Sequence, residues 1–162
     1  MKKLWVILLT ALLLSGCGAE ETMETVADVY VEPVMVVQRS LQLELPEGAA
    51  SPVSDSGGGQ WYACDGFEIG VQTFSAGDLG ATVRSLTGYD RDALTVVETR
   101  QDGVSRYDFV WVSTGENGET MNRGLILDDG NFHYCLTANG EAEHAAETRE
   151  VWQRLFSSVY LS

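Results

Sequence analysis

Cysteine and histidine are the side chains of this sequence best suited to form a nucleophile–base pair. The 162 residues contain three cysteines and two histidines. His133 and Cys135 lie two residues apart in an apolar stretch, so their side chains share one face of an expected strand. Their Cα atoms would be about 6–7 Å apart, and a catalytic Cys–His pair needs hydrogen-bond contact. The pattern favours a sheet-face histidine beside a structural cysteine, and an envelope enzyme that uses this pair stays the alternative.

Longer catalytic motifs are absent from the sequence. It has no Gly-x-Ser-x-Gly elbow, no His-Glu-x-x-His motif and no Walker loop. The acidic run Asp128-Asp129-Gly130-Asn131 lacks the twelve-residue spacing of a calcium loop, and turn chemistry explains it. We therefore predict no catalytic residues, no metal site and no cofactor.

The first residues have the pattern of an export signal. Lys2 and Lys3 precede an apolar run from Leu4 to Leu14, which is followed by small residues and Cys17. The apolar run is about eleven residues long, whereas a membrane-spanning helix needs about 20. We expect this segment to be removed as a signal peptide.

The run Leu14-Ser15-Gly16-Cys17 resembles the lipobox of bacterial lipoproteins. The resemblance implies a diacylglycerol group on the Cys17 sulfur and cleavage before that residue, which makes residues 1–16 the signal peptide. It places the mature protein on the extracytoplasmic face of a bacterial membrane, held by lipid. An ordinary secreted protein with a cysteine at this position is the alternative.

The charge of the chain limits its partners. The formal net charge is −14, and removal of the signal peptide takes both lysines away, leaving 8 arginines against 24 acidic residues. A surface this acidic repels nucleic acid and anionic lipid. We predict no nucleic-acid binding and contact with the membrane through the lipid on Cys17 alone. A protein or small-molecule partner at the cell envelope stays open.

An acidic tether is expected to follow the anchor, over residues 17–35. Residues 18–33 contain five acidic and no basic side chains. As a flexible coil, this stretch would span about 20–25 Å. A short helix capped by Thr22 is the alternative.

Residues 36–162 are expected to form a single domain rich in β-hairpins. Its Asx-Gly pairs tolerate the positive φ of tight turns. They are Asp65-Gly66, Asp102-Gly103, Asn117-Gly118, Asp129-Gly130 and Asn139-Gly140. The expected strands are residues 38–45, 60–64, 67–74, 94–100, 104–113, 119–127 and 131–137.

Two helices are expected among these strands. Apolar residues recur at helical spacing from Leu79 to Leu86, with Asp78 as the N-cap and Gly88 just past the end. A longer amphipathic helix is expected from about 141 to 159. The fold class is therefore α+β: an antiparallel meander sheet of about six or seven strands, with a short middle helix and a long C-terminal helix packed on it.

The order of elements resembles the PsbP-like α/β/α sandwich family, which includes the LpqN and DcrB lipoproteins. The resemblance rests on the opening strand that ends at 45–48, on the hairpins around Trp111, and on the closing helix around Trp152 and Phe156. It implies a small binding or assembly protein without shared catalytic residues.

Cys64 and Cys135 are the two cysteines that remain after Cys17, and an exported chain with an even pair can form a disulfide. Two buried free thiols are the alternative. From the sequence, the favoured function is a membrane-anchored, non-enzymatic binding or assembly lipoprotein. An envelope enzyme and a ligand-free structural surface protein remain alternatives.

Overall fold

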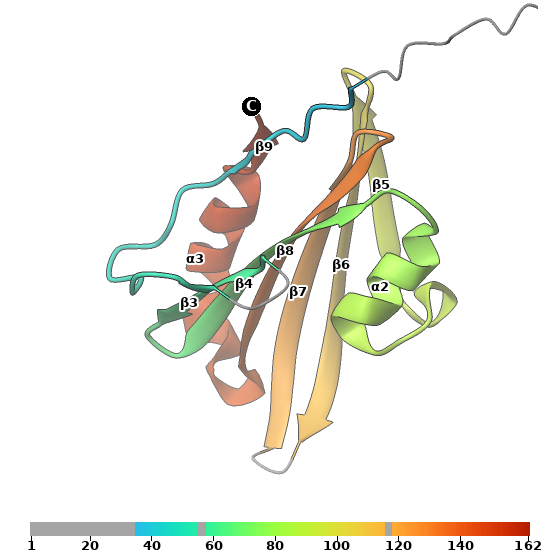
Figure 1. Cartoon of the computed structure of the whole chain (residues 1–162). Helices are drawn as coiled ribbons and strands as arrows, with labels where there is room; N and C mark the ends of the chain where they lie inside the picture. Colours follow the sequence, from blue (N-terminus) through green and yellow to red (C-terminus); the bar gives the residue numbers. More distant parts are fainter. Residues whose placement is uncertain (1–34, 55–57, 116–117) are drawn as a thin grey trace, which may run out of the picture. The chain divides into compact units, whose positions relative to one another are not determined.

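The computed structural model describes residues 35–54, 58–115 and 118–162. Residues 35–162 form one compact unit. The predicted signal peptide, Cys17 and almost all of the tether lie outside the described residues. In chain order the elements are β1 Leu41–Gln42, β2 Val53–Ser54, β3 Gln60–Cys64, β4 Phe67–Ser75, α2 Leu79–Thr87, a 3-10 turn Arg91–Ala93, β5 Val96–Gln101, β6 Val104–Gly115, β7 Gly118–Asp128, β8 Phe132–Glu141, a 3-10 turn Ala142–His144, α3 Ala145–Ser157 and β9 Tyr160–Leu161 (Figure 1).

Seven of the strands form one antiparallel sheet in the order β2-β3-β4-β8-β7-β6-β5. The chain first builds β2, β3 and β4 side by side. It then crosses through α2 to the far edge and returns as the meander from β5 to β8, so that β8 pairs with β4. The predicted antiparallel sheet with two helices is confirmed.

The Asx-Gly pairs explain most of the hairpins. Asp65-Gly66 joins β3 to β4 and Asp102-Gly103 joins β5 to β6, with both glycines at positive φ. The predicted turn role of Asn139-Gly140 is wrong, because both residues lie inside β8 and are paired on both sides. A Cβ at Gly140 would lie 3.4 Å from the Trp152 ring, so the glycine allows α3 to approach the sheet closely.

Helix α3 covers one face of the sheet over its central strands. Apolar side chains of β4, β7 and β8, among them Ile69, Leu125 and Leu136, pack against Trp152 and Phe156 of the helix. Alternate residues of each strand supply this core, as the period of two along a strand requires. We call this side of the sheet the α3 face.

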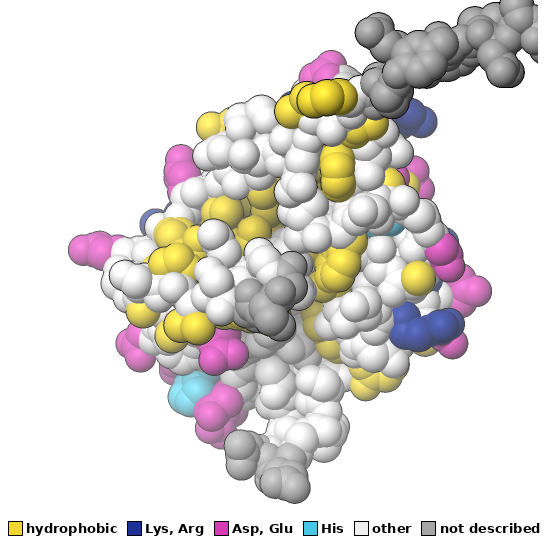
Figure 2. All heavy atoms as spheres, viewed as in Figure 1, with side chains coloured by type: hydrophobic (Ala, Val, Ile, Leu, Met, Phe, Trp, Pro, Cys, Tyr) yellow, Lys and Arg dark blue, Asp and Glu magenta, His cyan; other side chains and the backbone are white. Residues whose placement is uncertain are grey.

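Helix α2 covers the opposite side, which we call the α2 face. Val83 of the helix packs against Tyr107, Phe109 and Trp111 of β6 and against Ile126 of β7. Figure 1 shows α2 in front of the sheet and α3 behind it. The two helices therefore enclose one sheet between them. On the α2 face, acidic side chains lie around the margin and apolar side chains gather across the middle (Figure 2).

The predicted caps of α2 are confirmed. The Asp78 carboxylate accepts a hydrogen bond from the Gly80 amide at 3.0 Å, and Gly88 ends the helix in the left-handed region at φ 78°. The C-terminal helix is shorter than the expected 141–159. It begins at Ala145 after a 3-10 turn, and residues beyond Ser157 turn into β9.

The expected strand over residues 38–45 is mostly irregular. Only Leu41–Gln42 is a strand, and it pairs with β9 in a separate two-stranded sheet. Leu41 and Leu43 still pack against the core of the α3 face. Leu45, the third leucine of the expected face, is 41% exposed, so the predicted alternation of burial holds only in part.

Helix α3 leaves one end of its face uncovered. Val97 on β5 and the outward valines Val110 and Val112 on β6 are exposed on the α3 side. The same two strands are covered by α2 on their other side. The uncovered part of the sheet therefore lies around β5 and β6 on the α3 face.

Candidate functional site

The structure places His133 in the interior, bound to helix α2. Its Nδ1 lies 2.7 Å from the Thr82 hydroxyl oxygen, and its Nε2 lies 3.8 Å from an oxygen of the Asp128 carboxylate. A hydroxyl, an imidazole and a carboxylate thus stand in the order of a catalytic triad. However, His133 is 1% exposed and Thr82 is 8% exposed, so a substrate has no access to either group. The arrangement joins α2 to the sheet.

Cys135 is also unsuited to nucleophilic chemistry. It shares the α2 face with His133, as expected, but it packs among apolar side chains of the core. Burial raises the pKa of its thiol to about 12, so the reactive thiolate is not formed near neutral pH. Its Sγ approaches the His133 carbonyl oxygen at 3.7 Å and makes no hydrogen bond to the imidazole. The His133–Cys135 pair of the enzyme hypothesis is not assembled.

The two cysteines of the domain are free thiols, so the possible disulfide between Cys64 and Cys135 is not formed. Cys64 packs on the α3 face beside Phe67, whereas Cys135 lies on the α2 face. Their strands are also separated by β4, in which Phe67 faces Cys64 and Gln72 faces Cys135. Bridging them would require both a change of face and a shift along the sheet.

The acidic turn at Asp128-Asp129-Gly130-Asn131 uses its oxygens for its own backbone. Asp128 accepts a hydrogen bond from the Gly130 amide. Asp129 accepts hydrogen bonds from the amides of Asn131 and Phe132, and from the Tyr134 hydroxyl at 2.9 Å. Turn chemistry therefore accounts for these carboxylates, as predicted.

A second set of potential metal ligands lies at the start of α3. Side-chain ligand atoms of Glu141, Glu143 and His144 lie within 4.8 Å of one another, and the His144 Nδ1 lies 3.2 Å from Glu147. Such a set could hold a divalent cation. The acidic residues also face the positive end of the helix dipole, which explains their position without an ion.

Cys64 and His144 line one cavity of about 410 Å³ with Glu147. Burial raises the pKa of the Cys64 thiol, and no hydrogen bond joins it to the imidazole among the described residues. This second Cys–His combination therefore lacks the contact that would activate a thiol.

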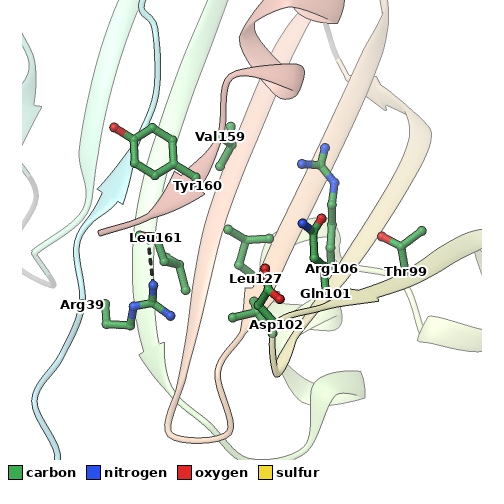
Figure 3. Close-up of a pocket in the computed structure, with 10 residues that line it drawn as sticks. Arg39, Thr99, Gln101, Asp102, Arg106, Leu127, Val159, Tyr160 and Leu161 are labelled. Atoms are coloured by element: carbon green, nitrogen blue, oxygen red, sulfur yellow. Dashed lines mark hydrogen bonds between the residues drawn. The ribbon is translucent and has the colours of Figure 1, made fainter.

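An open pocket on the α3 face combines cationic and apolar side chains. Its volume is about 320 Å³, at the lower end of the range of small-molecule sites. Leu127, Val159 and Leu161 form its apolar part, while Arg39 and Arg106 approach from opposite sides (Figure 3). The remaining lining residues are Thr99, Gln101, Asp102, Val104 and Tyr160.

Each arginine of the pocket is fixed by the fold. The Arg39 side chain donates to the Leu161 carbonyl at 2.8 Å, and its backbone amide donates to the Tyr134 hydroxyl. Arg106 binds the Asp108 carboxylate through Nε and Nη2, and also donates to the Phe156 carbonyl at 2.9 Å. Two guanidinium groups are therefore held beside an apolar surface, which suits an anionic group with an apolar neighbour.

Little in the sequence indicates this pocket. Arg106 and Asp108 are two residues apart on β6, so their proximity on one face was readable. Arg39 is 67 positions away from Arg106, and no local pattern joins them. Only the return of the chain as β9 brings the two together.

Comparison with other sequences gives a partial match. No protein family model matches the chain. Two phosphate acyltransferases from strains of Limosilactobacillus reuteri are 31% identical to it over 107 residues. That match covers 52% of this chain, and the chain spans about a third (31%) of the length of these curated relatives.

Comparison with solved structures supports the fold. LpqN of Mycobacterium tuberculosis, described as involved in cell envelope biogenesis, matches with a TM-score of 0.50 at 10% identity over 77% of this chain and 84% of its own. A Bacteroides thetaiotaomicron protein matches with a TM-score of 0.51 at 11% identity over 75% of this chain and 45% of its own. Cyanobacterial PsbP from Synechocystis is less similar, with a TM-score of 0.44 at 12% identity over 82% of this chain and 99% of its own. The likeness to LpqN and to the Bacteroides thetaiotaomicron protein supports a fold shared with these two structures.

No helix within the described residues has the length and apolar character needed to cross a bilayer.

Proposed function

We propose that this chain is a lipid-anchored protein on the extracytoplasmic face of a bacterial membrane, whose domain binds or assembles a partner without catalysing a reaction. One observation carries the proposal. The histidine and cysteine that the sequence offered for catalysis are enclosed in the sheet, whereas the open pocket presents Arg39 and Arg106 with no cysteine or histidine in its lining. The side chains that line the open pocket are therefore suited to binding a ligand.

The anchor and the envelope location rest on the lipobox-like run Leu14-Ser15-Gly16-Cys17. The similarity of fold to LpqN, a protein involved in cell envelope biogenesis, supports the same location. The phosphate acyltransferase match covers less than a third of those enzymes, so we infer no acyl-transfer activity from it.

We expect the ligand to carry a phosphate or carboxylate beside a short apolar segment. Toward other described residues, Arg39 uses Nη2 and its backbone amide, which leaves Nε and Nη1 to bind an anion. Leu127, Val159 and Leu161 offer the apolar contact. The chain is strongly acidic as a whole, whereas two arginines and one acidic residue, Asp102, line this pocket.

The anchor is tested by substituting Cys17. In cells that express the full chain, wild type should take up labelled palmitate and fractionate with membranes. Cys17→Ala should lose the label and leave the membrane fraction, while Cys64→Ala, in the domain, should behave as wild type. Membrane association of Cys17→Ala would contradict the anchor.

The pocket is tested by titrating the mature chain carrying Cys17→Ala with octyl phosphate, with octanol as the uncharged control. Arg39→Gln should weaken octyl phosphate binding about ten-fold, because a charge-assisted hydrogen bond is lost. Arg149→Gln, an exposed arginine of α3 outside the pocket, is the matched control and should have no effect. Equal binding by both variants, or no binding to wild type, would contradict the pocket assignment.

A further inference from the structure

Strand β5 is an open edge of the main sheet. It spans Val96–Gln101 and pairs with β6 on one side only (Figure 1). Its residues from Val97 onward are exposed, and Val97 itself is 57% exposed. Among the described residues, no loop or side chain forms a hydrogen bond to its outer edge. Alternate residues of this six-residue strand therefore present backbone donors and acceptors to solvent.

Natural proteins protect such edges, and this strand carries the charged residues Glu98 and Arg100 but lacks the other usual protections. Edge strands are commonly blunted by lysine, proline, a bulge or very short length. The β5 strand contains no lysine or proline, and its pairing with β6 runs without a bulge from Val96 to Gln101. At the opposite edge, by contrast, β2 is only two residues long.

The charges of β5 are complementary to those of a second β5. Glu98 and Arg100 are two residues apart, so both point to the α2 face. When two copies of the strand pair antiparallel about a two-fold axis at Thr99, each Glu98 lies opposite the Arg100 of the other copy. Opposite charges that face each other across a strand pair stabilise it, and a Thr–Thr pair does so too.

We propose that two copies of this chain pair through β5, in the register centred on Thr99, to form one continuous sheet of fourteen strands. The closed two-fold contact uses the β5 edge of both copies, and the joined sheet then ends on each side in the two-residue strand β2. On the α3 face, Val97 lies opposite Gln101 of the other copy. Thr99 and Gln101 also line the arginine pocket, so the two pockets come to lie on either side of the axis.

The net negative charge of each copy opposes this association. Repulsion between exposed charges is screened over about 8 Å at physiological ionic strength. The Glu98–Arg100 pairs lie in direct contact across the interface and are screened less. The net negative charge of the two copies therefore limits the affinity of the dimer, while the Glu98–Arg100 pairs select the register of β5 against β5.

The register is tested by disulfide trapping of the full chain in cell envelopes, in a Cys64→Ser background. Thr99→Cys should form a disulfide-linked dimer, since residues directly opposite lie about 4.5–5.5 Å apart between Cα atoms. Val97→Cys and Gln101→Cys are the matched controls. Each lies about 13 Å from its own equivalent in this register, at ~3.3 Å per residue. A chain with either cysteine alone should form no disulfide-linked dimer, whereas coexpression of the two variants should give one.

The charge complementarity is tested in the Thr99→Cys chain. Glu98→Arg or Arg100→Glu alone replaces two opposite-charge pairs by two like-charge pairs, and should weaken dimer formation about ten-fold. The double variant with both reversals restores the pairs and should recover the dimer. Resistance of each variant to limited proteolysis checks that the hairpin still folds.

Three outcomes overturn the proposal. The first is that Thr99→Cys cross-links no better than Val97→Cys. The second is that the double reversal fails to recover the dimer. The third is a cross-linked product of a different mass, which would identify another protein as the occupant of the edge.

Discussion

Phe109 and Val110 are neighbours on β6 whose surroundings differ as much as any two in the domain. Phe109 points to the α2 face, packs with Trp111 and Val83, and is 3% exposed. Val110 points to the α3 face and is 57% exposed. A short helix thus completes the interior on one side, while the other side stays open. The arginine pocket and the exposed Val97 of β5 belong to that open side.

Truncation of these neighbours should give the largest contrast in stability. Phe109→Ala removes a buried ring and should lower the free energy of unfolding by about 3–5 kcal/mol. Val110→Ala should change it by less than about 0.5 kcal/mol, because the side chain is largely solvated. Urea denaturation followed by tryptophan fluorescence measures both. Similar losses in the two variants would show that the α3 side of β6 is covered in solution.

The local parts of this fold were readable from the sequence. The Asp65-Gly66 and Asp102-Gly103 turns and the Asp78 and Gly88 caps depend on a few adjacent residues, and the structure confirms them. Asn139-Gly140 follows the same local rule but lies within β8. There, pairing with β4 and β7 on both sides overrides the turn preference.

The His133 contact and the arginine pocket depend on residues far apart in the chain. Local sequence patterns therefore could not predict which residues meet there. Thr82 and His133 meet across 51 positions. Arg39 reaches the pocket only because the segment before β1 pairs with the end of the chain. The spacing of His133 and Cys135 predicted a shared face correctly. The alternation along a strand predicts which face a side chain takes, but not how deeply it is buried. It therefore could not distinguish a structural histidine from a catalytic one.

The polar contact under α2 should have the second-largest effect on stability. Thr82→Val keeps the shape of the side chain but leaves the His133 Nδ1 without a partner in the interior. The expected loss is about 1–3 kcal/mol in the free energy of unfolding. Thr82→Ser keeps the hydroxyl and is the control, with a smaller loss. Equal losses in the two variants would assign the effect to packing rather than to the hydrogen bond.

The smallest expected effect concerns Asp129, which belongs to the α3 side of the turn. Desolvation opposes its charge, but hydrogen bonds from the amides of Asn131 and Phe132 and from the Tyr134 hydroxyl outweigh it. With the charge of Arg39, they hold the pKa of the Asp129 carboxyl below its ordinary value of 3.8.

A lowered pKa means that the folded state favours the ionised carboxylate. This contribution is fully present above the unfolded value, and it is lost as the pH falls through the folded value. Asp129→Asn should therefore remove part of the acid-induced loss of stability below about pH 4. Urea midpoints measured from pH 2 to pH 7 would show this as a flatter acid limb for the variant. An acid limb as steep in Asp129→Asn as in wild type would contradict the assignment to Asp129.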